Sequence, residues 1–366
     1  MQTSRQSEVA PLTAEGPPVK QMVGGAGMLA RVYRYKGLAL ALVGCILLAV
    51  LPSLYDVLFG FSAGFELHRI SLIGIFALAA FAQNILTGYA AQPSLGNAAF
   101  FGLGGYLLAW LAGDLGMPYW SAVLVAMIAS AVVGVVVGGP ALRVSGAYLA
   151  IATLGLVFIA GSLFDLWDTA AGRQSYEINN LPAALGDDHW LYFLVMVIAV
   201  AVFAVGAVLL RSRVGRAWIA IRDSEAAAVA CGVQVTYYKL LAFVVSAAVT
   251  GLAGALYAIW AQTAGSSMSS ADQTIVFLAM IVVGGLGSIV GSVLGALFVG
   301  FLPLALGQLP SPLAVGGLTI QLSTLTTGIY GLLLLLALIF FPAGLASVVE
   351  RSRSLVGRLA RRGGGA

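Results

Sequence analysis

Residues 211–239 read RSRVGRAWIAIRDSEAAAVACGVQVTYYK and separate two long apolar runs, LYFLVMVIAVAVFAVGAVLL (191–210) and LLAFVVSAAVTGLAGALYAIW (240–260). The basic residues of this polar interruption are Arg211, Arg213, Arg216, Arg222 and Lys239. Apolar runs of this length cross a bilayer as helices, and a short loop rich in Lys and Arg stays on the cytoplasmic side. The stretch therefore predicts two membrane spans joined by a cytoplasmic loop.

The middle of this loop carries the start and stop signals of a short helix. Ser224 is a good N-cap, and Glu225 then falls in the first turn, near the positive end of the helix dipole. Residues 225–230 are nearly all alanine, which is the strongest helix former. Gly232 follows as a candidate C-cap. We expect a short helix with small side chains at the membrane surface, a form suited to docking into a groove of another protein.

The composition indicates an integral membrane protein. The chain has 366 residues, of which 60% are hydrophobic and 9% charged, whereas soluble domains carry about 25% charged residues. The apolar runs lack the alternation of a transmembrane β-barrel. We predict an all-α fold, a polytopic transmembrane helical bundle of about ten hydrophobic segments with 8–10 spanning helices. The basic residues lie at loops and termini, so the net charge of +4 gives no reason to expect a nucleic-acid partner.

The chain divides into three parts. Residues 1–36 are predicted to be a disordered cytoplasmic tail, residues 37–346 the transmembrane domain, and residues 347–366 a basic cytoplasmic tail. Every Lys and Arg except Arg69 and Arg173 falls on the assigned cytoplasmic side, which places both termini in the cytoplasm. The predicted hydrophobic segments are 37–55, 70–90, 88–111, 119–138, 147–166, 191–210, 240–260, two shorter ones within 275–302, and 319–342.

Two segments are predicted to depart from plain helix. Pro93 and the glycines at 96–105 predict a break near Gln92–Ser94, followed by a short or re-entrant helix, because irregular backbone at membrane depth must be buried or line a cavity. A Gly-rich join is expected within 275–302. The loop before residue 70 is assigned the polar residues Asp56, Glu66, His68 and Arg69. Residues 167–189 form the longest polar stretch on the outer face.

The quoted loop resembles the coupling loop of bacterial ABC importer permeases, and most closely the membrane subunits of branched-chain amino acid transporters. The segment VGRAWIAIRDSEAAAVACGV (214–233) matches that family's docking motif at Glu225, Ala226, Ala227 and Gly232, with one residue more before the glycine. Further segments resemble the family in order along the chain: GYAAQPSLGNAAFFGLGGY (88–106), ALRVSGAYLAIATLGL (141–156), VVGGLGSIVGSVLGALFV (282–299) and FFPAGLA (340–346). The second of these points to one of two paralogous permeases.

The resemblance implies a permease subunit of the bacterial inner membrane that imports branched-chain amino acids or a similar small polar solute. It implies cytoplasmic ATPase subunits, a second related permease subunit in a heterodimer, and a periplasmic substrate-binding protein as partners. The chain lacks the pattern G-x-x-x-x-G-K-[ST], so ATP is expected to be used by the partner. We expect no catalytic site, no bound cofactor, no metal site and no disulfide between Cys45 and Cys231.

The sequence leaves the substrate open. Asn97 stands where the family usually has His, Pro93 replaces a usual Leu, and TAAGRQSYEINN (169–180) replaces a Thr-Gly-Gly-rich loop. Urea, short amides or other small carboxylates are alternative substrates. A stand-alone secondary transporter is a further alternative, although intramembrane acids typical of ion coupling are not evident.

Polar residues within the spans are the candidates for the substrate pathway. They are Gln83, Asn84, Gln92, Ser94, Asn97, Tyr148 and Thr153. Such residues face a substrate path or form hydrogen bonds between helices, and the sequence does not decide between these roles. In the loop, Arg216 and Arg222 are expected to orient the segment or to pair with acidic groups of the ATPase.

Overall fold

The computed structural model describes residues 63–141, 146–178 and 181–307, with short pieces at 313–315, 318–320, 331–332, 335 and 344–345. The predicted tails (1–36 and 347–366), the first span (37–55), Arg143 and most of the last span (319–342) lie outside the described residues.

Five long helices in the described ranges are apolar enough to cross a membrane. They are α2 with its π-helical end η1 (Ala63–Asn84 and Ile85–Tyr89), α4 (Tyr119–Ala141), α5 (Ala147–Ala170), α7 (Asp188–Arg211) and α10 (Val235–Ala261). The shorter apolar helices are α3 (Asn97–Gly113), α11 (Ala271–Gly284) and α12 (Ile289–Gly307). The prediction of a helical, multi-pass membrane protein is therefore confirmed, while the full number of segments and the location of the termini stay predictions.

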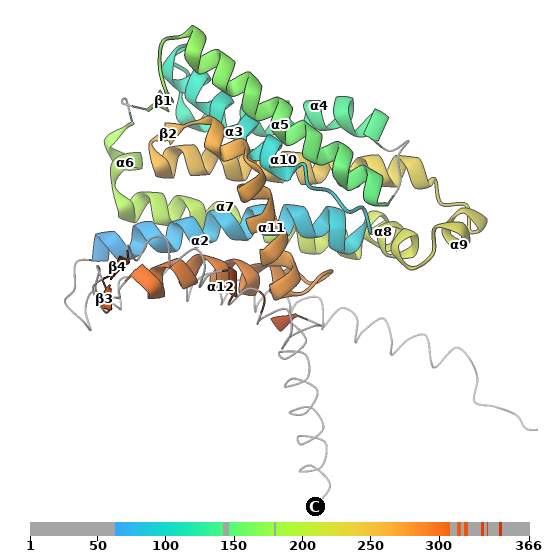
Figure 1. The fold of residues 1–366 in the computed structure, drawn as a ribbon. Helices are drawn as coiled ribbons and strands as arrows, with labels where there is room; N and C mark the ends of the chain where they lie inside the picture. Colours follow the sequence, from blue (N-terminus) through green and yellow to red (C-terminus); the bar gives the residue numbers. More distant parts are fainter. Residues whose placement is uncertain are drawn as a thin grey trace, which may run out of the picture. The chain divides into compact units, whose positions relative to one another are not determined.

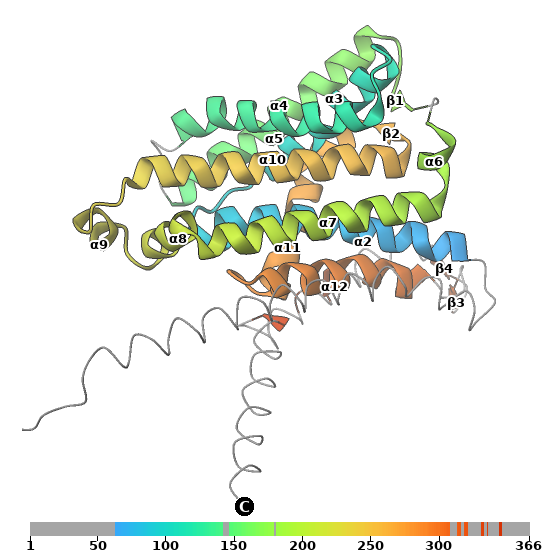
Figure 2. The same ribbon diagram turned by 180° about the vertical axis from the view of Figure 1, so that it is seen from behind.

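Short elements connect these helices. They are α6 (Ala183–Gly186), α8 (Arg213–Asp223), α9 (Glu225–Ala230), η2 (Ser266–Ser269), and the strands β1 (Tyr176–Glu177), β2 (Thr263–Ala264), β3 (Leu313–Val315) and β4 (Leu318–Ile320). β1 pairs with β2 and β3 with β4, both antiparallel. Figures 1 and 2 show α8 and α9 at one end of α10 and the β1–β2 pair at the other end.

The predicted break between the second and third segments is confirmed. The last turn of the first helix widens into the π-helix η1, and residues 90–96 then run without regular structure before α3 begins at Asn97. Ala91 has a φ of 51°, a left-handed conformation that is uncommon outside glycine. Gln92 and Ser94 of the break are buried, whereas Ala91 is exposed; irregular backbone at membrane depth must be buried or line a cavity.

The centre of the bundle is formed by α3 and α10, which pack closely because they meet through glycines. A Cβ on Gly104 would lie 1.9 Å from the carbonyl oxygen of Gly251, and a Cβ on Gly254 would lie 1.9 Å from that of Phe101. Any larger side chain would push the two backbones apart. α10 also packs on α2 and α4, and α2 packs on α7 and α12. α5 and α7 instead expose most of their apolar side chains.

The start of the first described helix differs from the prediction. The polar residues before position 70 were assigned to a loop, but the helix begins at Ala63 and includes His68. The His68 ring stacks on Trp260 with the ring centroids 4.6 Å apart, and its Nδ1 lies 2.9 Å from a carboxylate oxygen of Asp188. Through these contacts the polar side chain of His68 has partners at the helix end. The helix can therefore extend beyond its apolar stretch.

Candidate functional site

The predicted loop between α7 and α10 is largely helical. α8 follows α7 directly, and the Oγ of its N-cap Ser212 accepts a hydrogen bond from the backbone N–H of Val214 (3.1 Å). Trp218, in the middle of α8, is fully buried, and its Nε1 donates to the carbonyl oxygen of Tyr238 (2.8 Å). A buried indole with a satisfied N–H holds α8 firmly against the first turns of α10.

The short helix predicted around Glu225 is confirmed as α9, with Ser224 as its N-cap; its C-cap is Cys231, and Gly232, predicted as the C-cap, is the next residue. The Oγ of Ser224 accepts from the backbone N–H of Ala227 (3.3 Å). Gly232 has a φ of +81°, and the next N–H, of Val233, donates to the carbonyl oxygen of Ala228 (3.0 Å). This is the usual way in which a glycine ends a helix.

The outer surface of α9 is small and exposed. Ala226 and Ala227, which carry the family resemblance, both face solvent. Glu225 is exposed as well, and its carboxylate pairs with the ammonium of Lys239 at the start of α10 (2.7 Å). Because an exposed pair of this kind contributes little stability, Glu225 can exchange this partner for another at low cost.

The two arginines singled out in the loop lie in different places. The Nη1 of Arg222 donates to the carbonyl oxygen of Gly88, in η1 (3.1 Å). Arg216 remains exposed, and its Nη1 donates to the carbonyl oxygen of Arg211 at the end of α7 (3.1 Å). Arg222 therefore joins the exposed segment to the interior break, whereas Arg216 stays on the surface.

Asn84 connects the interior break to the turn between α11 and α12. Its Nδ2 donates to the carbonyl oxygen of Ser288 and to the Oγ of Ser292 (both 2.8 Å). Its Oδ1 accepts from the backbone N–H of Gly287 (2.8 Å). Gly287 has a φ of +74°, and a Cβ there would lie 2.7 Å from the Nη1 of Arg222. Arg222, Asn84 and this glycine turn are thus in one contiguous cluster.

The remaining polar residues of the break hold its backbone. The Nε2 of Gln83 donates to the carbonyl oxygen of Ser94 (2.6 Å), and the Oγ of Ser94 accepts from the N–H of Gly96 (3.2 Å). The Nε2 of Gln92 donates to the carbonyl oxygen of Lys239 (3.1 Å). The Oε1 of Gln92 is buried without a hydrogen-bond partner among the described residues. An unpaired buried acceptor of this kind is rare and calls for an explanation.

Asn97 and Thr153 are buried beside the break, whereas Tyr148 is not. The Nδ2 of Asn97 donates to the Oγ of Ser246 (3.2 Å), and the Oγ1 of Thr153 accepts from the N–H of Leu95 (2.9 Å). The side chain of Tyr148 is 75% exposed at the start of α5. The structure therefore brings all the pathway candidates together except Tyr148.

Sequence reasoning missed several residues that complete this cluster. They are Thr87, whose Oγ1 contacts Gln83 and Gln92, Ser246, whose Oγ donates to the carbonyl oxygen of Ala82, Thr274, whose Oγ1 donates to the carbonyl oxygen of Leu95, and Ser292. Small hydroxyl residues inside a predicted span were the available signal, because in membranes they form hydrogen bonds between helices.

A second polar cluster fixes the chain at the other end of the bundle. The hydroxyl of Tyr106 donates to the carboxylate of Asp168, which is buried and also accepts from the Nε of Arg173 (3.1 Å). The guanidinium of Arg173 lies over the ring of Tyr176, 3.9 Å from its centroid. Asp168, expected in an outer loop, is thus a buried residue of α5, because two donors satisfy its charge.

Tyr176 extends this cluster to the end of α3. Its hydroxyl donates to the carboxylate of Asp114. Burial raises the pKa of Tyr176 to about 12, and the hydrogen bond to Asp114 and the negative charge of that carboxylate contribute to the same increase. The phenol therefore stays protonated across the physiological range and acts as a fixed donor.

The comparisons with known proteins define the class of this chain. A family model described as "Branched-chain amino acid transport system / permease component" matches residues 67–341, so the chain belongs to this family of membrane permeases. The matched region contains the interior break and the α8–α9 segment described above. This chain has five helices in the described ranges that are long and apolar enough to cross a membrane, which fits a permease.

Individual relatives place the similarity more narrowly. The chain is 29% identical over 254 residues to the high-affinity branched-chain amino acid transport system permease protein LivM of Salmonella typhimurium. This alignment covers 61% of this chain and 59% of the relative. It is 28% identical over 259 residues to LivM of Escherichia coli, covering 62% and 60%. The match thus spans about three-fifths of the relatives. No solved structure shows a significant match.

Proposed function

We propose that this chain is the membrane permease subunit of an ATP-driven ABC importer that moves branched-chain amino acids, or a similar small polar solute, into the cytoplasm. A separate ATPase would drive it through residues 211–239. One observation carries the proposal: a small, exposed helix, α9, is joined through α8 and Arg222 to the backbone of the buried break at Gly88.

The contacts of α8 give docking at α9 a route to the interior. A shift of α8 would pull on Gly88 through Arg222, and on the start of α10 through the indole of Trp218. Asn84 would pass the movement to the turn at Gly287. ATP can drive transport only if ATP and solute favour different conformations of the permease, and we propose that these contacts differ between the two conformations.

The proposed assembly contains partners beyond this chain. Cytoplasmic ATPase subunits would dock on Glu225, Ala226, Ala227 and Gly232, and Arg216 would remain free to pair with acidic ATPase groups. A second related permease subunit would complete a heterodimer in the bacterial inner membrane, and a periplasmic binding protein would deliver the solute. ATP would be bound and hydrolysed by the partner, and this chain would hold no cofactor of its own.

Gln92 is the leading candidate for contact with the solute. Its Oε1 is a buried acceptor without a partner among the described residues, and an ammonium or amide group of a solute would satisfy it. Gln83, Asn84, Ser94, Asn97 and Thr153 already make hydrogen bonds inside the protein. We assign these five a supporting role in shaping the path.

Deletion of residues 225–232 tests the coupling role. The variant and a Cys231→Ser control, both in the full chain, are expressed with the neighbouring transport genes and purified with whatever remains bound. We expect the deletion to insert in the membrane but to lose the ATPase and ATP-driven uptake, while the control keeps both. ATP-driven uptake by the deletion variant would contradict the assignment, and uptake by the purified chain in vesicles without an ATPase would favour a stand-alone transporter.

A further inference from the structure

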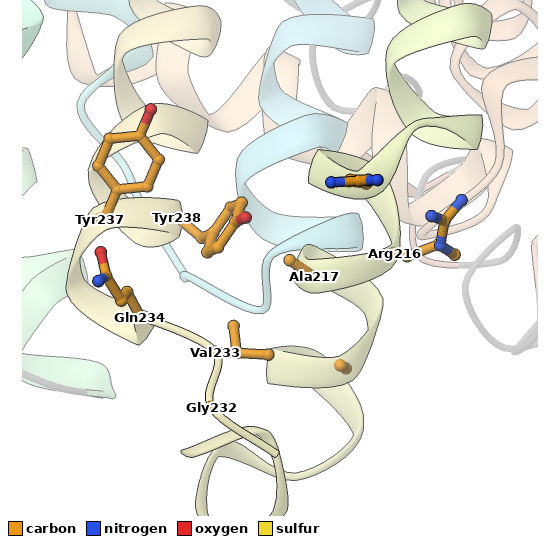
Figure 3. Close-up of a pocket in the computed structure, with 9 residues that line it drawn as sticks. Arg216, Ala217, Gly232, Val233, Gln234, Tyr237 and Tyr238 are labelled. Atoms are coloured by element: carbon orange, nitrogen blue, oxygen red, sulfur yellow. The ribbon is translucent and has the colours of Figure 1, made fainter. Parts of the chain in front are cut away.

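A groove of about 450 Å³ lies between α8 and the first turns of α10. Its α8 wall consists of Arg213, Arg216, Ala217 and Ala220, whose spacing puts them on one face of a helix. Tyr237 and Tyr238 form the α10 wall, and residues 232–234 close one end. Figure 3 shows Arg216 and Ala217 on α8 across from Tyr237 and Tyr238 on α10.

The groove carries unneutralised positive charge. No acidic residue lines it, and among the described residues neither Arg213 nor Arg216 pairs with a carboxylate. The nearby acids are engaged elsewhere, Asp223 with Arg222 at 3.6 Å and Glu225 with Lys239 at 2.7 Å. A concave site with two guanidinium groups is suited to an anion with several acceptor oxygens, such as a phosphate.

The position of the groove along the spans places it at the level of the lipid headgroups. Arg213 follows the last residue of α7 by two positions, and arginine is costly in the hydrocarbon core. α10 has 27 residues, so it is ~40 Å long and exceeds a hydrocarbon core of ~30 Å. Tyr237, at its start, is 58% exposed, and tyrosine is enriched at the membrane–water interface.

We propose that this groove binds the phosphate of an anionic phospholipid, of the phosphatidylglycerol type, from the leaflet on the side of α8. Arg213 and Arg216 would bind the phosphate oxygens, and the hydroxyl of Tyr237 or the amide of Gln234 would add a hydrogen bond. Basic pockets between transmembrane helices are a known form of anionic lipid site. The groove shares Arg216 and Gly232 with the proposed ATPase surface, so the site is tested by lipid binding to the chain without an ATPase.

Native mass spectrometry of the full-length chain in mild detergent tests this site directly. Phosphatidylglycerol is titrated onto the parent, the R213Q/R216Q variant and R211Q. R211Q removes one positive charge, at a neighbouring exposed arginine that does not line the groove. We expect the double variant to bind about 25-fold more weakly, since each basic residue contributes about fivefold, and R211Q to bind less than about twofold more weakly.

Further measurements identify the ligand and control for misfolding. Phosphatidylcholine is expected to bind all variants equally, and millimolar inorganic phosphate to leave phosphatidylglycerol bound. R213K/R216K keeps both charges and is expected to retain most of the affinity, and Tyr237→Ser supplies a test if the double glutamine variant does not insert. Unchanged binding by R213Q/R216Q, or an equal loss in R211Q, would overturn the site. Displacement by inorganic phosphate would overturn the lipid as its ligand.

Discussion

The interior break at residues 85–96 and the exposed segment at 211–234 are both polar, glycine-containing interruptions of an apolar chain, but they are built in opposite ways. In and beside the break nearly every polar side chain is buried and hydrogen-bonded; Gln83, near the end of α2, donates to the carbonyl oxygen of Ser94. In the exposed segment the backbone is satisfied by helix caps at Ser212 and Ser224. Its charged side chains lie at the surface, where the pairs of Glu225 with Lys239 and of Asp223 with Arg222 contribute little stability and can be exchanged for a partner or the membrane surface.

This difference shows what each region can do. The break holds a non-helical backbone in the interior, so its polar side chains are committed to structure, apart from the Oε1 of Gln92. The exposed segment needs none of its charged groups for its fold, apart from Arg222. That residue joins the two regions at Gly88. We therefore expect substitutions in the interior to change stability, and substitutions on α9 to change transport alone.

The largest effect is expected at the glycine contact that holds α3 beside the break. Gly104→Ala would place a Cβ 1.9 Å from the carbonyl oxygen of Gly251. Forcing the helices apart should cost about 3 kcal/mol, the upper end for overpacked cores, measured by thermal unfolding of the full chain in detergent. Gly155→Ala, in α5 with no atom within 4 Å of its Cβ, is the control and should be no less stable than the parent.

The next effect distinguishes two buried asparagines. Asn84→Leu removes three hydrogen bonds and leaves the Gly287 N–H without its acceptor. We expect a loss of about 2 kcal/mol, against about 0.6 kcal/mol for Asn97→Leu, which breaks one bond to Ser246. The same unfolding assay measures both. Equal losses would show that Asn84 does not tie the break to the α11–α12 turn.

On the exposed side, a bulky residue should block docking without unfolding the protein. Ala227→Trp enlarges an exposed side chain of α9, so ATP-driven uptake in vesicles should fall about tenfold, equivalent to about 1.4 kcal/mol of lost coupling. The unfolding temperature should stay that of the parent, and Ala227→Ser should retain uptake. Full uptake by the Trp variant would remove the distinction between the two regions.

The smallest effect is expected at Tyr176, far from both regions. Tyr176→Phe removes the hydrogen bond to Asp114 and should cost about 1 kcal/mol at neutral pH. Because the pKa of Tyr176 is raised to about 12, its contribution is complete below the unfolded value of about 10 and is lost as the pH rises toward 12. The stability difference between parent and variant should therefore shrink above pH ~10. The same substitution at exposed Tyr148 is the control.

Local chemistry made part of the structure predictable. Ser224 and Gly232 define α9 because capping depends on residues next to the helix. Pro93 marks the break because proline itself cannot continue a helix. α8 was missed because its charges at Arg213, Arg216 and Arg222 were interpreted as a loop. In fact they lie on a helix whose buried side carries Trp218.

Contacts between distant residues could not be predicted from one sequence. Arg222 and Gly88 are 134 positions apart, and Asn84 and Ser292 are 208 apart. No periodicity or motif relates such pairs, because only the packing of the helices brings them together. Burial could not be predicted from one sequence either. Tyr148 and Thr153 lie five residues apart in the same predicted span, yet Tyr148 is exposed and Thr153 is buried.

Crosslinking from Cys231 tests the central claim most directly. This cysteine is free, exposed and placed at the end of α9. A photo-crosslinker on Cys231 of a Cys45→Ser chain, in membranes with the assembled transporter, should capture the ATPase subunit. The same label on Gln174→Cys in a Cys45→Ser, Cys231→Ser chain, at the other end of the bundle, should not. Efficient labelling of Cys231 with intact ATP-driven uptake, but with no crosslink to an ATPase, would contradict the account.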